Sequence, residues 1–169
     1  MGRFFLSLFF ITTLLSSCEV TVKKNDDKEK NTDSKIRNGI VVTSKGIKVE
    51  QAFLLFEDGT LVPDDNLIRV NQKVILRLIV SGWKEKEGKV FVSGGEMVET
   101  SEGDVLFGDK NLFKDFSDGI TSRDAEYISM NVVISGVTKL FDYYKVSFQV
   151  KDDLATDNKL EGHYKLYLK

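Results

Sequence analysis

Apolar and polar residues alternate with a period of two along much of the chain. Such a period places successive side chains on opposite faces of an extended backbone, so it predicts β-strands with one buried face. In the segment VILRLIV, for example, Val74, Leu76 and Leu78 fall on one face. From this alternation and from short apolar runs we predict strands over residues 47–56, 74–80, 89–92, 127–134, 143–150 and 163–169.

Turn-forming residues separate these segments. Residues 57–60 (EDGT) predict a turn after the first strand, residues 93–95 (SGG) end the strand at 89–92, and residues 135–136 (SG) predict a further turn. No helical period is sustained. The best helical candidate is one or two turns over residues 109–116, with Asp109 as the N-cap.

This pattern predicts an all-β fold in residues 39–169. About seven or eight short strands favour a single antiparallel two-sheet sandwich, and a small β-barrel is the alternative. The pattern is similar to that of immunoglobulin-like sandwiches. Their Cys…Trp…Cys signature is missing, because Trp83 has no cysteine partners in a chain with one cysteine.

The chain begins like an exported protein. Arg3 is followed by an apolar run over residues 4–15 and then by Ser16-Ser17-Cys18, the three regions of a secretory signal. A helix of about 12 residues is roughly 18 Å long, too short for a hydrocarbon core of about 30 Å. We therefore expect a signal peptide over residues 1–17 and not a transmembrane anchor.

Leu15-Ser16-Ser17-Cys18 resembles the lipobox of bacterial lipoproteins. The resemblance implies a diacylglyceryl group on the Cys18 sulfur, cleavage before Cys18 and acylation of the new amino terminus, and therefore a membrane anchor. Glu19, where an Asp would retain an enteric lipoprotein in the inner membrane, favours the outer membrane. Exposure on the periplasmic or the surface side stays open. Because Cys18 is the only cysteine, no disulfide is expected within the domain.

The residues after Cys18 are polar. Residues 18–38 are rich in Lys, Asp, Glu and Asn and carry few large apolar side chains, so we expect a disordered tether there, followed by the sandwich domain over 39–169. Removal of residues 1–17 takes away only one charged side chain, Arg3. The mature chain then has 23 basic and 26 acidic residues, a net charge of −3. This balance argues against nucleic acid as a partner.

Residues suited to catalysis are sparse. His163 is the only histidine, it falls on the solvent phase of the last predicted strand, and we expect it to be solvated. With one histidine and a lipidated cysteine, an ordinary zinc site cannot be assembled. No G-x-S-x-G, G-x-G-x-x-G or P-loop motif occurs, so no cofactor and no enzymatic activity are expected.

Two features are candidates for binding. Oxygen ligands crowd the loop before the last strand, and this predicts either a weak calcium site or an ordinary hairpin loop at Asp152, Asp153, Asp157, Asn158 and Glu161. Apolar residues also break the alternation, which predicts a partner face of Leu54, Phe56, Ile75, Ile79, Tyr143 and Tyr167. The segment 103–123, with several Leu and Phe residues, either covers that face or leaves it open.

These observations favour a membrane-anchored, non-enzymatic binding module for an unknown protein or glycan ligand. The alternatives are a carbohydrate-active or other hydrolytic enzyme and a structural subunit of an envelope assembly. A buried acidic pair beside a cleft would favour the enzyme. A bare hydrophobic edge would favour the assembly.

Overall fold

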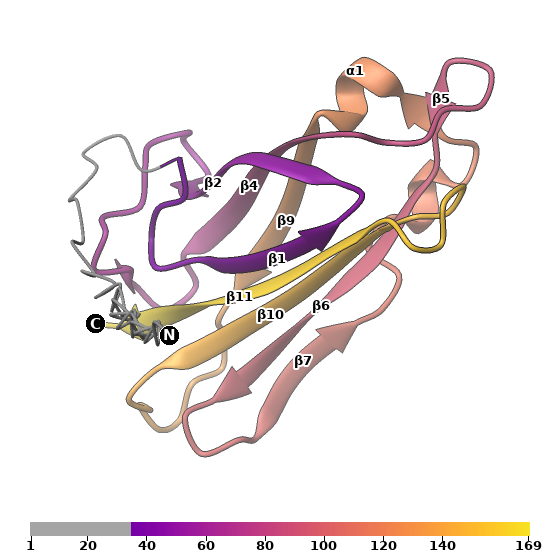
Figure 1. The fold of residues 1–169 in the computed structure, drawn as a ribbon. Coiled ribbons are helices and arrows are strands. Elements are labelled where there is room, and N and C mark those ends of the chain that lie inside the picture. The colour runs from indigo at the N-terminus through magenta and orange to yellow at the C-terminus, as the bar shows by residue number, and fades with distance from the viewer. Residues whose placement is uncertain (1–34) are drawn as a thin grey trace, which may run out of the picture. The chain divides into compact units, whose positions relative to one another are not determined.

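Two antiparallel β-sheets face each other in the part of the chain that the structure, a computed structural model, describes, residues 35–169 (Figure 1). The larger one, here called the main sheet, has six strands, five of which follow the order β1 (Val41–Lys45), β11 (Lys159–Leu168), β10 (Tyr144–Asp152), β6 (Val92–Thr100) and β7 (Val105–Asp109). All neighbours along this order are antiparallel. The two-residue strand β3 (Leu67–Ile68) pairs in parallel with the end of β11.

The second sheet, here called the small sheet, has three strands. β4 (Lys73–Ser81) lies in its centre, between β2 (Lys48–Phe56) and β9 (Tyr127–Val133). A two-stranded pair of β5 (Lys89–Val90) and β8 (Ile120–Thr121) lies at one end, beside the short helix α1 (Ser122–Ala125). The remaining element is a single 3-10 turn, η1 (Lys114–Phe116).

The inward side chains of both sheets form one hydrophobic core. Val74, Leu76 and Leu78 of β4 are fully buried, as are Val146 and Val150 of β10. Each such side chain contributes about 1.5–3 kcal/mol relative to an exposed one. The two sheets remain open, and no strand pair joins them. The predicted two-sheet antiparallel sandwich is therefore confirmed, and the alternative of a closed barrel is wrong.

The predicted strands at 47–56, 74–80, 127–134, 143–150 and 163–169 correspond to β2, β4, β9, β10 and β11. The prediction that residues 93–95 end a strand is wrong, because β6 runs through them. A Cβ on Gly94 would lie 2.2 Å from the Gln149 carbonyl oxygen. These glycines therefore serve a close approach of neighbouring backbones and not a turn.

The segment 103–123 does not fold back as a cover. It supplies β7, which widens the main sheet, and leaves Leu106, Phe107 and Phe116 about half exposed. Phe113 enters the core, and Leu112 and Ile120 pack partly against it. The helix expected at 109–116 shrinks to η1, and Asp109 ends β7, where its carboxylate accepts a hydrogen bond from the Asn111 backbone N–H over 2.8 Å.

The folded part begins before the predicted boundary at residue 39. The Arg37 N–H donates to the Ala52 carbonyl oxygen over 2.8 Å, and the Ala52 N–H donates to the Lys35 carbonyl oxygen over 2.9 Å, which ties this segment to β2. Residues 1–34, with the lipobox, Cys18 and most of the predicted tether, lie outside the described residues. Among residues 35–169, no helix has the length and apolar character needed to cross a membrane.

Candidate functional site

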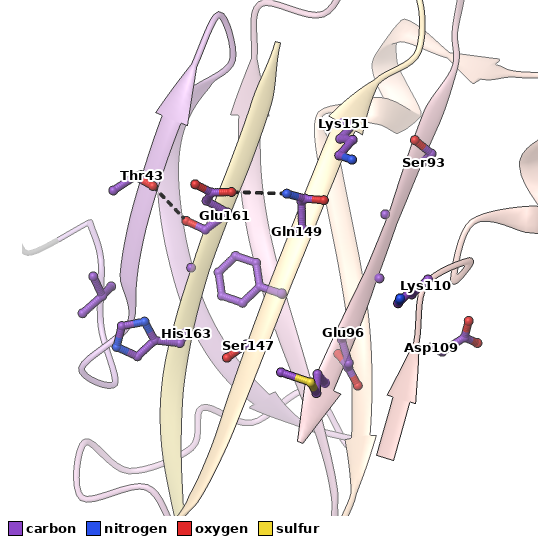
Figure 2. Close-up of a pocket in the computed structure, with 16 residues that line it drawn as sticks. Thr43, Ser93, Glu96, Asp109, Lys110, Ser147, Gln149, Lys151, Glu161 and His163 are labelled. Atoms are coloured by element: carbon purple, nitrogen blue, oxygen red, sulfur yellow. Dashed lines mark hydrogen bonds between the residues drawn. The ribbon is translucent and has the colours of Figure 1, made fainter. Parts of the chain in front are cut away.

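A hollow of about 690 Å³ lies on the solvent side of the main sheet, across β1, β11, β10 and β6 (Figure 2). This volume is within the range of about 300–1,000 Å³ that is common for ligand pockets. Its polar lining comes largely from outward positions on these strands, among them Thr43, Glu161, Gln149, Ser147, His163 and Lys151. We call it the hollow below.

The register of the strands sets the side chains of the hollow in rows. In one row, Thr43 of β1 lies opposite Glu161 of β11, which lies opposite Gln149 of β10, which lies opposite Gly95 of β6. Residues directly opposite on one face have Cβ atoms about 4.5–5.5 Å apart. Four strands therefore place a hydroxyl, a carboxylate, a carboxamide and a glycine side by side.

A second row lies beside the first. Val41, His163, Ser147 and Met97 are successive partners on β1, β11, β10 and β6. His163 was expected to be a solvated surface residue, but it is half-buried in the wall of the hollow. The second row adds an imidazole and a hydroxyl to the polar groups of the first, with apolar side chains at both ends.

Two glycines beside the hollow mark places where neighbouring backbone segments approach closely. A Cβ on Gly95 would lie 2.2 Å from the Asp109 carbonyl oxygen and 2.6 Å from the Lys110 Cα. Backbone atoms at the end of β7 thus occupy the place of a side chain and form the wall on that side. On β11, a Cβ on Gly162 would lie 2.2 Å from the Val41 carbonyl oxygen. The main sheet is bare of side chains at these two positions because neighbouring chain segments approach so closely.

Hydrogen bonds orient the polar groups of the first row. The Gln149 Nε2 donates to Glu161 Oε2 over 3.2 Å, and the Thr43 hydroxyl donates to the Glu161 carbonyl oxygen over 3.4 Å. The hydrogen bonds from Gln149 and Lys159 lower the pKa of the Glu161 carboxyl, so this group is charged at neutral pH. Figure 2 shows the carboxamide oxygen of Gln149 on the side toward β6, away from Glu161.

The five candidate calcium ligands are not gathered in one cluster. Asp152 is buried, and its carboxylate accepts hydrogen bonds from the backbone N–H groups of Lys84 and Leu154 over 2.7 and 3.0 Å. Asp157 pairs with Lys45, and Asp153 accepts from Ser93. Of the candidates, only Asn158 reaches Asp152, over 3.4 Å, and Glu161 lies in the hollow. Within residues 35–169, no three His, Cys, Asp or Glu side chains come together as a metal site.

The predicted partner face is not a single face either. Leu54 is fully buried in the core, because β2 turns Ala52 and Leu54 inward, and Phe56 packs partly against the same core. Ile75 and Ile79 are half-buried on β4 of the small sheet. Tyr143 and Tyr167 belong to the main sheet region, and the Lys165 ammonium lies 3.8 Å from the Tyr143 ring centroid.

Glu96 is the site residue that sequence reasoning missed. It is 4% exposed on the inward phase of β6, and neither carboxylate oxygen has a hydrogen-bond partner. Burial, and then the charge of Asp109, raise the pKa of Glu96 to about 7. The signal was present in the sequence, because Val92, Glu96 and Val98 share one phase. This shared phase can be recognised only if residues 93–95 are assigned to a strand.

Comparisons with known proteins concern the fold. No family model and no curated protein matches the sequence. Among solved structures, the crystal structure of the C-terminal domain of wzt is similar to this chain, with 17% sequence identity and a TM-score of 0.46. The match covers 79% of this chain and 80% of that one.

Proposed function

We propose that this protein is a lipid-anchored, non-enzymatic binding module of the bacterial cell envelope, and that the hollow holds its ligand. The observation that carries the proposal is the row Thr43–Glu161–Gln149–Gly95, which places three polar side chains and a glycine across four strands. Sites built on a regular sheet hold their side chains in fixed geometry, because the backbone hydrogen bonds leave little freedom.

The ligand class that fits the hollow best is a glycan. Hydroxyl, carboxamide, carboxylate and ammonium groups are mixed along the lining, with Lys151 and Glu161 of opposite charge. A mixed lining favours a ligand that is itself rich in donors and acceptors and carries little net charge. Val41 and Met97 at the ends of the second row offer apolar contact to the C–H faces of sugar rings.

The anchor in this proposal is the lipid on Cys18. Lys35, the first described residue, follows Cys18 by 17 positions. At about 3.3–3.6 Å per residue, a chain of that length spans at most about 60 Å. The domain would therefore work within that distance of the membrane surface, and we place it at the outer membrane.

Binding of envelope glycans tests the proposal. The mature lipidated protein in detergent should bind a subset of oligosaccharides on an array of bacterial envelope glycans. Gln149→Ala should weaken that binding about tenfold, the scale of one or two lost hydrogen bonds. Gln51→Ala is the matched control, because Gln51 is an exposed residue on β2 of the small sheet. Binding that is absent from the wild type, or equal in the two variants, would contradict the proposal.

Hydrolysis of a glycosidic bond is the second candidate function, and one observation favours it. Glu96 and Asp109 are cross-strand partners on β6 and β7, and both line the hollow. A carboxyl of raised pKa beside a second carboxylate is the usual pair of glycosidases. Both Glu96 oxygens are buried from solvent, however, and we therefore favour binding. Release of reducing ends that stops in Asp109→Asn would reverse this preference.

A further inference from the structure

The two sheets differ in width, and the difference leaves part of the main sheet uncovered. The main sheet continues past β6 to β7, whereas the small sheet ends at β9. Phe107 of β7 lies opposite Val98 of β6, so both face inward. Val98 is 3% exposed, but Phe107 is 48% exposed. The inward face of β7 therefore extends beyond the strands that cover the rest of the main sheet (Figure 1).

A groove of about 400 Å³ occupies this uncovered place. Glu96 and Val98 of β6, Leu106 and Phe107 of β7, and residues 131–135 at the end of β9 line it. Its walls are largely apolar, and Leu106 and Val133 are about half exposed. We call it the groove below.

One side of the groove is bordered by a strand edge that has no β-sheet partner. β9 pairs with β4 along one edge, and its other edge pairs with no strand of residues 35–169. An unpaired strand edge presents N–H and C=O groups that accept an added strand. A strand added beside β9 would extend the small sheet beneath β7 and cover Phe107.

The groove also contains an unpaired acid. Glu96 is more than nine-tenths buried, and both of its carboxylate oxygens lack a hydrogen-bond partner. A buried charge without a partner is costly, and a cation with hydrogen-bond donors offsets that cost. Burial and the neighbouring Asp109 raise the pKa of this carboxyl, and a cationic ligand would favour its ionised form.

We propose that the groove binds an extended strand of a partner protein, which pairs with the free edge of β9. Its inward-facing residues are apolar and flank one Lys or Arg, whose cationic group meets the Glu96 carboxylate. The apolar residues cover Phe107 and Leu106. This inference goes beyond the proposed function. The groove opens between the two sheets, whereas the row Thr43–Glu161–Gln149 of the hollow lies on the outer face of the main sheet, and of the lining residues the two places share only Glu96.

A designed peptide pair tests the match between strand and groove. The probe is the acetylated heptapeptide Ser-Val-Thr-Lys-Ser-Val-Thr, whose Val and Lys residues share one face of a strand, and its partner carries norleucine in place of Lys. Binding to the mature lipidated protein in detergent is measured by fluorescence anisotropy of labelled peptides. We expect the Lys peptide to bind about tenfold more tightly than the norleucine peptide.

Two variants assign that preference to Glu96. Glu96→Gln should reduce the tenfold preference to twofold or less, because the shape is kept and the charge is lost. Glu99→Gln is the matched control on the same strand, because its side chain points to the opposite face and pairs there with Lys145. It should keep the full preference. Equal binding of the two peptides by the wild type, or loss of the preference in both variants, would overturn the proposal.

A third variant tests the apolar wall. Phe107→Ser is expected to fold, because the side chain is half exposed, and it should weaken both peptides at least fivefold. Peptide binding should also protect the amides of β9 from hydrogen exchange. Unchanged affinity in Phe107→Ser, or no binding by the wild type at millimolar peptide, would overturn the proposal. So would a wild-type dimer that Phe107→Ser dissociates, since a second copy would then fill the groove.

Discussion

The Nδ2 of Asn38 donates a hydrogen bond to the Oδ1 of Asn66 over 2.9 Å, and the Nδ2 of Asn66 donates to the Asn38 carbonyl oxygen over 2.7 Å. Both side chains are buried, and both residues have a positive φ, of 56° and 55°. The Asn38 Oδ1 also accepts from the Leu54 N–H, and the Asn66 Nδ2 also donates to the Lys165 carbonyl oxygen. The pair thus links the start of the folded chain to both sheets.

Asn66→Ala should lower the free energy of unfolding by about 2–4 kcal/mol. The substitution removes the hydrogen bonds that the Asn66 Nδ2 donates to the carbonyl oxygens of Asn38 and Lys165, whereas the Asn38 Nδ2 keeps its bonds to the carbonyl oxygens of Val62 and Pro63. Loss of a partner by a buried polar group costs about 1–3 kcal/mol. The substitution also places Ala at a positive φ. Asn71→Ala is the control, because Asn71 has a φ of 64° but an exposed side chain, and it should lose about 1 kcal/mol. Urea unfolding compares them, and equal losses would assign the effect to the backbone alone.

Glu96 should make the fold less stable as the pH rises. Its pKa is about 7 in the folded protein against 4.5 for an ordinary glutamate, so the folded state holds this proton more tightly. The stabilisation is fully present below about pH 4.5 and is lost as the pH rises through 7. It amounts to at most about 3 kcal/mol.

Glu96→Gln should therefore flatten the decline in stability between pH 5 and 8 and be more stable than the wild type at pH 8. The charged group that acts on Glu96 is Asp109 on β7. Tyr164 of β11 is also affected by Glu96, but burial raises the pKa of its hydroxyl well above the usual value, so it stays neutral over this pH range. Chemical denaturation at several pH values measures the slope. A wild-type slope equal to that of the variant would show that Glu96 does not titrate in this range.

Gly95→Ala should destabilise the fold by about 2–3 kcal/mol, because the new Cβ would collide with backbone atoms of Asp109 and Lys110. Gly108→Ala is the matched control on β7. Its Cβ would meet nothing nearer than the Met97 Cγ, at 3.9 Å, so we expect a change within about 0.5 kcal/mol. Thermal unfolding at one pH distinguishes the two, and similar stability of both variants would contradict the close-packing explanation.

Cys18→Ala should abolish lipidation, because the thiol is the only acceptor atom for the diacylglyceryl group. In a detergent phase-partition experiment, the wild type should enter the detergent phase and the variant the aqueous phase. Ser17→Ala is the control, because a small residue remains before the cysteine. Detection of residues 1–17 on the mature wild-type protein by mass spectrometry would contradict the lipoprotein assignment.

The strands and the fold class were predictable from the sequence because their cause is local. In β4 and β10, buried and half-buried positions alternate with the period that the sequence shows. A period of two places successive side chains on opposite faces of a strand, independently of which strand it pairs with. The inward rows of five strands, and hence a sandwich with one core, therefore followed from residue types alone.

A glycine can mark either a turn or a close approach between two backbone segments, and the local sequence pattern does not distinguish these two. Residues 93–95 were interpreted as a turn, yet Gly94 and Gly95 lie within β6 because the backbones of β10 and of residues 109–110 approach them. That approach depends on strands that are about 15 and 55 positions away along the chain. Because the predicted strand stopped at residue 92, Glu96 was not assigned to a strand, and its position on the inward face could not be recognised.

The candidate sites were decided by the tertiary structure, because each also needs strands from distant parts of the chain: β1 pairs with β11 and β10 pairs with β6 at the hollow, and β7 lies near the end of β9 at the groove. Thr43, Glu161 and Gln149 meet only through the register of β1, β11 and β10. The groove exists because the main sheet has β7 beyond β6 while the small sheet stops at β9. The sequence by itself determined which residues face inward along each strand, since side-chain alternation is a property of the single strand. Strand order, register and sheet width follow from long-range packing, and these decided which polar groups share a hollow and which apolar ones were left uncovered.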